Sequence, residues 1–394
     1  MDNHVDKTKS IYTLPFILLC LSSLLFCASF NMIIPELPNH LSQMGGAEHK
    51  GLIIALFTLT AGISRPFSGK LTDRWGRVPV MIIGSVVCFI CGFLYPILTS
   101  IAGFFFLRLI HGFSTGFKPT ATAAYIADII PQSRWGEALG MHGLAFAVGS
   151  AVGPAIGSYI AKDYGIDFMF YCSSAFALLS ILIVIRMGET LADKHAFSWS
   201  MLRINRSEII EWRAIPAGIV TLLSYSGYGV ILTLIPDWSD HLGIGNKGLF
   251  FTAYTLASIS IRFLSGKVSD RYGRIRVMYV GIIIISISLL LLGLNDSIEG
   301  LIWGAIVYGV GGGILSPAVN AWTIDLSLPQ HRGKAMATMY IALEIGIGGG
   351  ALLAGYIYRD EISKIPFIFI LNSVIIFLAF FYVLQWDIKN KRSR

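Results

Sequence analysis

Charged side chains are scarce in this sequence. Asp, Glu, Lys and Arg make up only 13% of its 394 residues, whereas hydrophobic residues make up 55%, and the mean hydropathy is +0.69. A typical soluble domain contains about 25% charged residues. The composition therefore excludes an ordinary soluble protein and favours one that lies largely within a lipid bilayer.

Signatures of several other protein classes are missing as well. The five cysteines all lie in apolar runs and are interpreted as packing residues; Cys88 and Cys91 have neither a second pair nor a flanking histidine for a metal site. The sequence has no Gly-x-x-x-x-Gly-Lys-Ser/Thr loop, the motif that binds the phosphates of ATP, so an ATP-driven pump is not expected. The sequence also has no Ser/His/Asp grouping and no loop large enough for a soluble active site. We therefore expect no enzyme, no metal and no cofactor.

Long apolar runs, in contrast, are abundant. A helix of about 20 apolar residues can cross a bilayer, and the sequence contains twelve such runs. The first follows a polar start and has no small-residue cleavage site, so we interpret it as a retained span rather than a signal peptide. The expected spans are 12–35, 51–71, 78–98, 103–127, 137–160, 166–187, 214–236, 247–267, 276–294, 299–322, 334–357 and 365–386.

Basic residues indicate how these spans are oriented. Of the 30 Lys and Arg residues, 21 fall on the side of the two termini, five on the opposite side and four within spans. Since cytoplasmic loops retain positive charge, both termini are predicted to be cytoplasmic, in a multi-pass protein of the cell inner membrane. The basic residues are spread over many short loops, so the net charge of +7 does not indicate nucleic-acid binding.

The chain contains an internal repeat at an offset of 197 residues. Residues 65–81 align with residues 262–278, and ten of these 17 positions are identical. We therefore predict two six-helix halves in the same orientation, the parallel type of repeat found in transporters. The first half is residues 1–187 and the second is residues 214–394. Residues 188–213 are predicted to be a cytoplasmic linker with an interfacial amphipathic helix near 198–212.

Three motifs carry a resemblance to a known family. They are Gly69, Asp73, Arg74, Gly76 and Arg77 after the second span, Arg108 and Gly112 in the fourth, and Gly149, Gly153, Pro154 and Gly157 in the fifth. These motifs resemble those of the major facilitator superfamily, in its twelve-span drug:proton antiporter-like branch. The resemblance implies an all-α membrane protein with two pseudo-symmetric six-helix bundles that works by alternating access.

The resemblance assigns the first motif to a cytoplasmic gate. Asp73 and Arg77, with Asp128 at the end of the fourth span, would form a charge cluster that closes the cytoplasmic face in the outward-facing state. The glycines would allow close backbone approach there. The alternative is that these charges only set the topology. The second half repeats the pattern at Gly266, Asp270, Arg271, Gly273, Arg274 and Asp325.

The glycines of the fifth span predict tight packing on a neighbouring helix. Pro154 predicts a bend in one half only, because Ala351 takes the equivalent position in the other half. By resemblance, this motif marks an exporter.

Ionisable groups inside spans are functional candidates, because each costs about 2.5–3.5 kcal/mol at the centre of a membrane helix. Arg65 and Arg262 occur at equivalent positions of both halves, which favours snorkelling or gating over substrate contact.

Four other ionisable residues lie within spans and have uncharged repeat mates, so they are the better candidates for proton or substrate handling. Glu344 and His111 are predicted to couple protons, and Arg108 and Lys118 to line a substrate cavity. The alternative for Glu344 is that it only neutralises a basic residue or caps a glycine-rich helix.

Polar and aromatic residues suited to a central cavity occur on several spans, although each alone could be a packing residue. They are Asn31, Tyr225, Tyr228, Tyr254, Asn320 and Trp322. Together with Arg108 and Lys118, they suggest an amphipathic substrate with an anionic group.

The sequence thus predicts a secondary active transporter that exports a small amphipathic molecule, with protons as the coupling ion and the chain acting as a monomer. Two alternatives remain open: proton-coupled uptake of a metabolite, and a non-transporting receptor of the same fold.

Overall fold

Twelve long helices account for most of the structure, a computed structural model that describes residues 11–131, 134–203, 210–328 and 331–392. Those of the first half are α1 (Leu14–Ile33), α3 (Lys50–Arg74), α4 (Arg77–Leu94), α5 (Ile101–Ile129), α6 (Trp135–Tyr164) and α7 (Ile166–Ile185). Those of the second half are α9 (Ile215–His241), α10 (Gly248–Tyr272), α11 (Arg274–Leu294), α12 (Ile298–Leu326), α13 (Arg332–Tyr358) and α14 (Ile365–Arg392). Short elements join them: α2 (Leu37–Gln43) and the 3₁₀ turns Ala47–His49, Trp199–Leu202, Trp212–Ala214 and Ile362–Lys364.

Each of the twelve expected spans coincides with one of these long helices. Ten of them, with adjoining turns, are long and apolar enough to cross a membrane. The remaining two are α5 and α10; α5 has 29 residues but carries Arg108, His111 and Lys118 within its length. The chain is therefore a multi-pass membrane protein.

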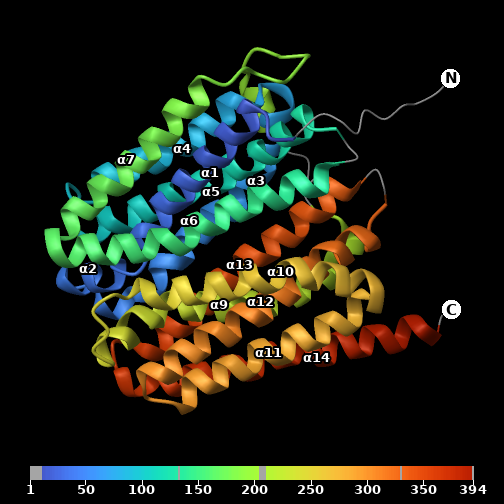
Figure 1. The fold of residues 1–394 in the computed structure, drawn as a ribbon. Helices are drawn as coiled ribbons and strands as arrows, with labels where there is room; N and C mark the ends of the chain where they lie inside the picture. The colour runs from blue at the N-terminus through green and yellow to red at the C-terminus, as the bar shows by residue number, and fades with distance from the viewer. Residues whose placement is uncertain (1–10, 132–133, 204–209, 329–330, 393–394) are drawn as a thin grey trace.

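The helices form two bundles with the same internal packing. Figure 1 shows the blue-to-green bundle of α1 to α7 beside the yellow-to-red bundle of α9 to α14. In the first bundle α1 packs on α6 and α7, and α5 packs on α3 and α4. The second bundle repeats these pairs as α9 on α13 and α14, and α12 on α10 and α11. The predicted pair of pseudo-symmetric six-helix bundles is confirmed.

The residues that start equivalent helices are also repeated in the two bundles. α5 begins after Ser100, whose hydroxyl accepts a hydrogen bond from the backbone N–H of Gly103 at 3.1 Å. α12 begins after Ser297, whose hydroxyl accepts one from Gly300 at 3.0 Å. Serine is favoured at this position because its oxygen satisfies an N–H that has no partner within the helix. Both helix starts therefore follow from the same short motif, 197 residues apart.

Two helix pairs make the largest contacts between the bundles: α3 with α13, and α6 with α10. Small residues allow both approaches. A Cβ on Gly51 of α3 would lie 2.4 Å from the carbonyl oxygen of Ala351 on α13, and a Cβ on Gly248 of α10 would lie 2.4 Å from that of Pro154 on α6. Larger side chains would separate the bundles at these points.

The linker between the bundles differs from its prediction. The backbone at Arg203 is extended, so residues 198–212 do not form one continuous amphipathic helix; residues 204–209 lie outside the described ranges. The segment before Arg203 lies on the first bundle. The backbone N–H of His195 donates to the carbonyl of Arg74 at 2.9 Å, and Phe197 packs on Trp75 with ring centroids 5.4 Å apart. These contacts hold the segment that precedes residue 198 against the first bundle.

Candidate functional site

The two ends of the bundles carry different charge arrangements. We call the end with the α3–α4 turn, the α10–α11 turn and linker residues 188–203 the linker face. The opposite end carries Lys50 and Lys247, which begin or immediately precede α3 and α10, and we call it the lysine face. α3 connects the two, because it begins at Lys50 and ends at Arg74.

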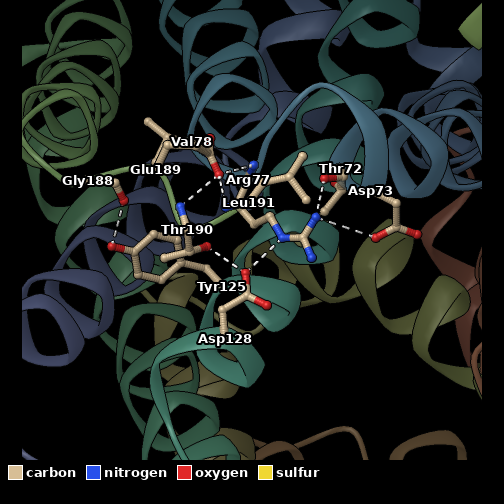
Figure 2. A network of polar contacts seen from close by, with 10 residues as sticks. All are labelled: Thr72, Asp73, Arg77, Val78, Tyr125, Asp128, Gly188, Glu189, Thr190 and Leu191. Atoms are coloured by element: carbon tan, nitrogen blue, oxygen red, sulfur yellow. Dashed lines mark hydrogen bonds and ion pairs between the residues drawn. The ribbon is translucent and has the colours of Figure 1, made fainter. Parts of the chain in front are cut away.

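On the linker face, Arg77 is the centre of a polar network (Figure 2). Its Nε donates to Oδ2 of Asp128 at 2.9 Å, and its NH1 donates to the carbonyl of Thr72 at 2.6 Å. Asp73 is more distant, with 3.7 Å between its Oδ1 and the guanidinium, and its side chain is 74% exposed. The structure thus brings Asp73, Arg77 and Asp128 together, and Asp128 is the stronger partner.

Glu189 completes this network and was missed by sequence reasoning. Its carboxylate accepts hydrogen bonds from the backbone N–H groups of Arg77 at 3.0 Å and Val78 at 3.1 Å, the first residues of α4. Burial alone would raise the pKa of Glu189, but these bonds and those from Thr190 and Leu191 lower it below its ordinary value. A carboxylate at a helix N-terminus is also favoured by the helix dipole. Only the fold reveals this role, since Glu189 is 112 residues from Arg77.

The second bundle repeats the arginine cluster. Nε of Arg274 lies 3.2 Å from Oδ2 of Asp325, and its NH1 contacts Asp270. The contacts described for the two clusters stay within one bundle or reach its adjoining linker segment. The guanidinium of Arg271 lies 5.5 Å from the centre of the Tyr272 ring. The backbone carbonyl of Arg74 accepts a hydrogen bond from the backbone N–H of His195 in the linker.

The gate glycines do not share one role. Gly76 and Gly273 have φ values of 139° and 93°, which favour glycine, and both precede a helix that starts with the cluster arginine. A Cβ on Gly69 would meet no atom within 4 Å, so the predicted close backbone approach is wrong there. Gly266 is the repeat mate of Gly69 and lies in α10.

The lysine face joins the two bundles by buried ion pairs. Nζ of Lys50, from the first bundle, lies 2.6 Å from Asp237 on α9 of the second. Nζ of Lys247, from the second bundle, lies 3.6 Å from Glu36, which follows α1 of the first. All four residues are buried. Further partners hold each pair: Asp360 lies 2.5 Å from Lys50, Asp240 2.7 Å from Lys247, and the Ser158 hydroxyl donates to Glu36 at 2.7 Å.

A sequence signal for these pairs exists at a second offset. Residues 33–41, IIPELPNHL, resemble residues 234–242, LIPDWSDHL, at an offset of 201. Glu36 and Asp237 are therefore repeat mates, as are Lys50 and Lys247 at the offset of 197. The segment between the carboxylate and the lysine is four residues longer in the first half than in the second. A comparison of the two halves at the single offset of 197 residues therefore does not align Glu36 with Asp237.

Between the two faces, Arg65 of α3 pairs with Glu344 of α13, with 2.5 Å between the guanidinium and the carboxylate. The guanidinium also lies 5.0 Å from the centre of the Tyr340 ring. Arg65 is 15 residues beyond Lys50, about 22 Å along the helix, so this pair lies well inside the molecule. Glu344 thus neutralises a basic residue, the role that sequence reasoning kept as its alternative.

Arg108 and His111 lie inside the first bundle. Arg108 donates to the carbonyl of Ile53 at 2.8 Å and lies over the Phe57 ring at 4.6 Å. His111 contacts the Tyr95 hydroxyl at 3.3 Å and the Cys88 sulfur at 3.3 Å. Because Arg108 is only 1% exposed and His111 is fully buried, this placement argues against Arg108 as a cavity residue.

Lys118 is placed in the same bundle, one layer further along α5. Its ammonium donates to the Ser22 hydroxyl at 2.7 Å and contacts the Ser180 hydroxyl, and it lies 4.9 Å from the centre of the Phe26 ring. It is 1% exposed, so it too is a buried lysine of the bundle interior and not a cavity residue.

A pocket lies on the second bundle, and four predicted cavity residues line it. Tyr225, Tyr228 and Tyr254 line one part, and Tyr225 and Asn320 line the adjoining part. Asn31 instead bonds the carbonyl of Cys27 in its own helix, at 2.9 Å, and Trp322 packs against Trp386 with ring centroids 4.9 Å apart. The prediction that Asn31 and Trp322 line the cavity is not supported, because neither side chain lines the pocket.

The glycines of α6 lie against the backbone of α1. A Cβ on Gly149, Gly153 or Gly157 would lie 2.5, 2.7 or 2.0 Å from the carbonyl oxygens of Leu24, Ala28 and Met32, respectively. α13 packs on α9 in the same way, since a Cβ on Gly350 would lie 2.0 Å from the carbonyl of Ser226. In α13, Ala351 takes the position that Pro154 has in α6. The carbonyl oxygen of Ala351 faces Gly51 on α3 of the other bundle.

Two helical bundles joined by buried ion pairs at one end, with a polar and aromatic pocket between the ends, are the architecture of a membrane transporter. Comparison with known proteins identifies which kind. The family model of the Major Facilitator Superfamily matches residues 19–215 and 217–394. The chain belongs to this superfamily.

Curated relatives are similar over most of their length. The chain is 25% identical to a multi-drug resistance efflux pump PmrA homolog of Lactococcus lactis, over 90% of this chain and 91% of the relative. It is 24% identical to the multidrug resistance protein MdtG of Salmonella paratyphi C, over 88% and 90%.

Solved structures share the fold. The human organic anion transporter MFSD10 (TETRAN) has a TM-score of 0.72 and 19% identity, covering 93% of this chain and 98% of that one. A POT family transporter in complex with a thioalcohol conjugated peptide has a TM-score of 0.78 and 12% identity, covering 96% of each chain.

Proposed function

We propose that this protein is a proton-driven exporter of small amphipathic molecules that works by alternating access. The observation that carries the proposal is the difference between the ends: ion pairs cross between the bundles on the lysine face, whereas the linker-face clusters stay within their own halves. A transporter that opens to one side at a time needs such exchangeable joins.

From the positive charge of its loops, we infer that the linker face is cytoplasmic, in the cell inner membrane. In this orientation, the ion pairs of the lysine face would close the transporter to the outside. One chain contains both bundles and the pocket, so we propose that a monomer suffices. Export, rather than uptake, is supported by relatives that are named multidrug efflux pumps and by the Gly-Pro motif of α6, where Pro154 would let the helix bend.

Glu344 is the proposed proton-coupling residue, acting through Arg65. A proton on the carboxylate would remove one charge of a pair that joins α3 to α13, and breaking a buried pair strongly destabilises the arrangement that contains it. Proton binding would therefore loosen this join and allow the bundles to rearrange. His111 has no carboxylate partner among its described contacts, so it is the weaker of the two coupling candidates.

The gates follow from the same reasoning. Lys50 with Asp237 and Lys247 with Glu36 would close the outer face, and would separate when the transporter opens outward. Arg77 with Asp73 and Asp128, and Arg274 with Asp270 and Asp325, would then form contacts between the halves on the cytoplasmic face.

The proposal is tested in proteoliposomes that carry a pH gradient and a panel of amphipathic dyes of both charges. We expect gradient-driven dye movement with wild-type protein, and movement that no longer depends on the gradient with Glu344→Gln. Glu361→Gln is the matched control, because it removes an exposed carboxylate that pairs only locally with Lys364. Gradient-driven transport by Glu344→Gln at the wild-type rate would refute the coupling role, and no dye movement by wild-type protein would refute export.

A further inference from the structure

Arg65 and Arg262 are repeat mates that the structure treats differently. Each lies at the same depth, on α3 and α10 respectively, 15 residues after the repeated lysines Lys50 and Lys247. Arg65 is neutralised by Glu344 at 2.5 Å. The residue equivalent to Glu344 in the first half is Ala147, which cannot neutralise Arg262. The repeat thus places two arginines at equivalent positions of the two bundles, but it supplies a carboxylate for one.

Arg262 is unpaired in the part of the chain that the structure describes. It is an exposed residue, and no hydrogen bond or ion pair joins its side chain to another described residue. Arg262 nevertheless lines the pocket on the second bundle. Of the described residues that line the two parts of this pocket, Arg262 alone carries a formal charge.

Four tyrosines line the same part of the pocket as Arg262: Tyr225, Tyr228, Tyr254 and Tyr308. Three of the rings pack in a row, with centroids 5.7 Å apart between Tyr228 and Tyr254 and 5.6 Å apart between Tyr254 and Tyr308. Ser224 and Ser316 add hydroxyl groups to the lining. Aromatic rings of a ligand pack favourably against such a surface at these separations.

We propose that this pocket binds an aromatic anion, whose carboxylate or sulfonate pairs with Arg262 and whose rings lie on the tyrosines. The guanidinium offers paired N–H donors that match such a group, and the absence of a competing carboxylate among the described lining residues leaves those donors available. A cationic aromatic molecule would meet the same rings but would be repelled by Arg262. The inference names the substrate class of the export proposed above and rests on it.

The test compares two dyes with the same xanthene framework and opposite charge, fluorescein as the anion and pyronin Y as the cation. Binding to the purified full-length protein in detergent at neutral pH is followed by fluorescence anisotropy. We expect fluorescein to bind at least about tenfold more tightly than pyronin Y, because a charge-assisted hydrogen bond contributes an energy of that order.

Variants then locate the interaction. Arg262→Gln should weaken fluorescein binding about tenfold and leave pyronin Y binding unchanged or tighter, while Arg262→Lys should retain part of the anion preference because it keeps the charge. Arg276→Gln, which removes an exposed arginine at the start of α11, is the matched control and should behave as wild type.

The outcomes separate the two proposals. Equal or tighter binding of pyronin Y, or fluorescein binding that neither Arg262 variant changes, overturns the anion site; gradient-driven transport of pyronin Y would at the same time uphold the export function. Fluorescein binding that depends on Arg262, without gradient-driven transport of any dye, upholds the site and refutes the function.

Discussion

The lysine face and the linker face both carry ion pairs, but buried pairs on the lysine face join the two bundles, whereas the arginine pairs described on the linker face each lie within one bundle. On the lysine face, Lys50 and Asp237 belong to different bundles and are 5% and 8% exposed, so their pair holds the bundles together. On the linker face, Arg77 and Asp128 belong to one bundle, and the neighbouring Asp73 is largely exposed. A buried pair across an interface resists separation, whereas an exposed pair within one half contributes little stability and can exchange partners. Under the proposed mechanism, the lysine face would be the closed end and the linker face the end that closes in the opposite state.

The largest effect is expected from Lys50→Met. It leaves the buried carboxylate of Asp237 without its partner, a change that costs about 3–5 kcal/mol in comparable buried pairs. The bundles should separate on the lysine face, as measured by increased labelling of a cysteine introduced at Ala55, a buried residue of α3 that faces Gly348 of α13, in a background without the native cysteines.

Two further variants make this measurement specific. Lys364→Met removes a half-exposed lysine on the same face and should leave labelling unchanged. Lys50→Met combined with Asp237→Asn should label less than Lys50→Met alone, because no uncompensated buried charge remains. Equal labelling of Lys50→Met and wild type would show that the pair does not hold this face closed.

The next largest effect is expected from Gly76→Ala. Its φ of 139° is strained for alanine, by about 1–3 kcal/mol, and the new methyl group would lie 2.4 Å from Oε2 of Glu189. Gly273→Ala is strained at a φ of 93° but meets nothing within 4 Å. Thermal unfolding should therefore rank Gly76→Ala as the less stable variant. The reverse order would contradict the role of Glu189 in shaping the first loop.

A smaller and pH-dependent effect is expected from Glu189→Gln. The folded pKa of Glu189 lies below its ordinary value, so its charge stabilises the protein at neutral pH, by about 0.3–1 kcal/mol for a carboxylate at a helix N-terminus. This contribution is lost as the pH falls through the folded pKa. The difference in melting temperature between wild type and Glu189→Gln should shrink in acid, and a constant difference would exclude the charge as its cause.

The smallest effect on stability is expected from Asp73→Asn. The side chain is 74% exposed and 3.7 Å from Arg77, and exposed pairs contribute about 0–1 kcal/mol. The variant should melt like wild type and reach the membrane normally, yet transport should fall sharply if Asp73 closes the cytoplasmic face in the opposite state. Wild-type transport would leave Asp73 only a role in topology.

Sequence patterns predicted the fold well, because membrane helices and duplicated motifs are local properties of the chain. Twelve apolar runs and the repeat at residues 65–81 and 262–278 were enough for two six-helix bundles. Predictions for single residues fared unevenly. Tyr225, Tyr228, Tyr254 and Asn320 do line a pocket, but Arg108 and Lys118 face the interior of their bundle, since helical periodicity alone does not say which side of a buried helix faces the other half.

The amino-acid sequence by itself determined the number of helices, the duplication and the charge bias of the loops, because hydrophobicity and repetition depend only on the order of residues. The tertiary structure decided the partners. Asp237 faces Lys50 from 187 residues away, and Glu344 faces Arg65 from 279 residues away. Such pairs depend on how the two bundles dock, and the docking is set by close packing at small residues such as Gly51 and Gly248, a collective property that no single motif encodes.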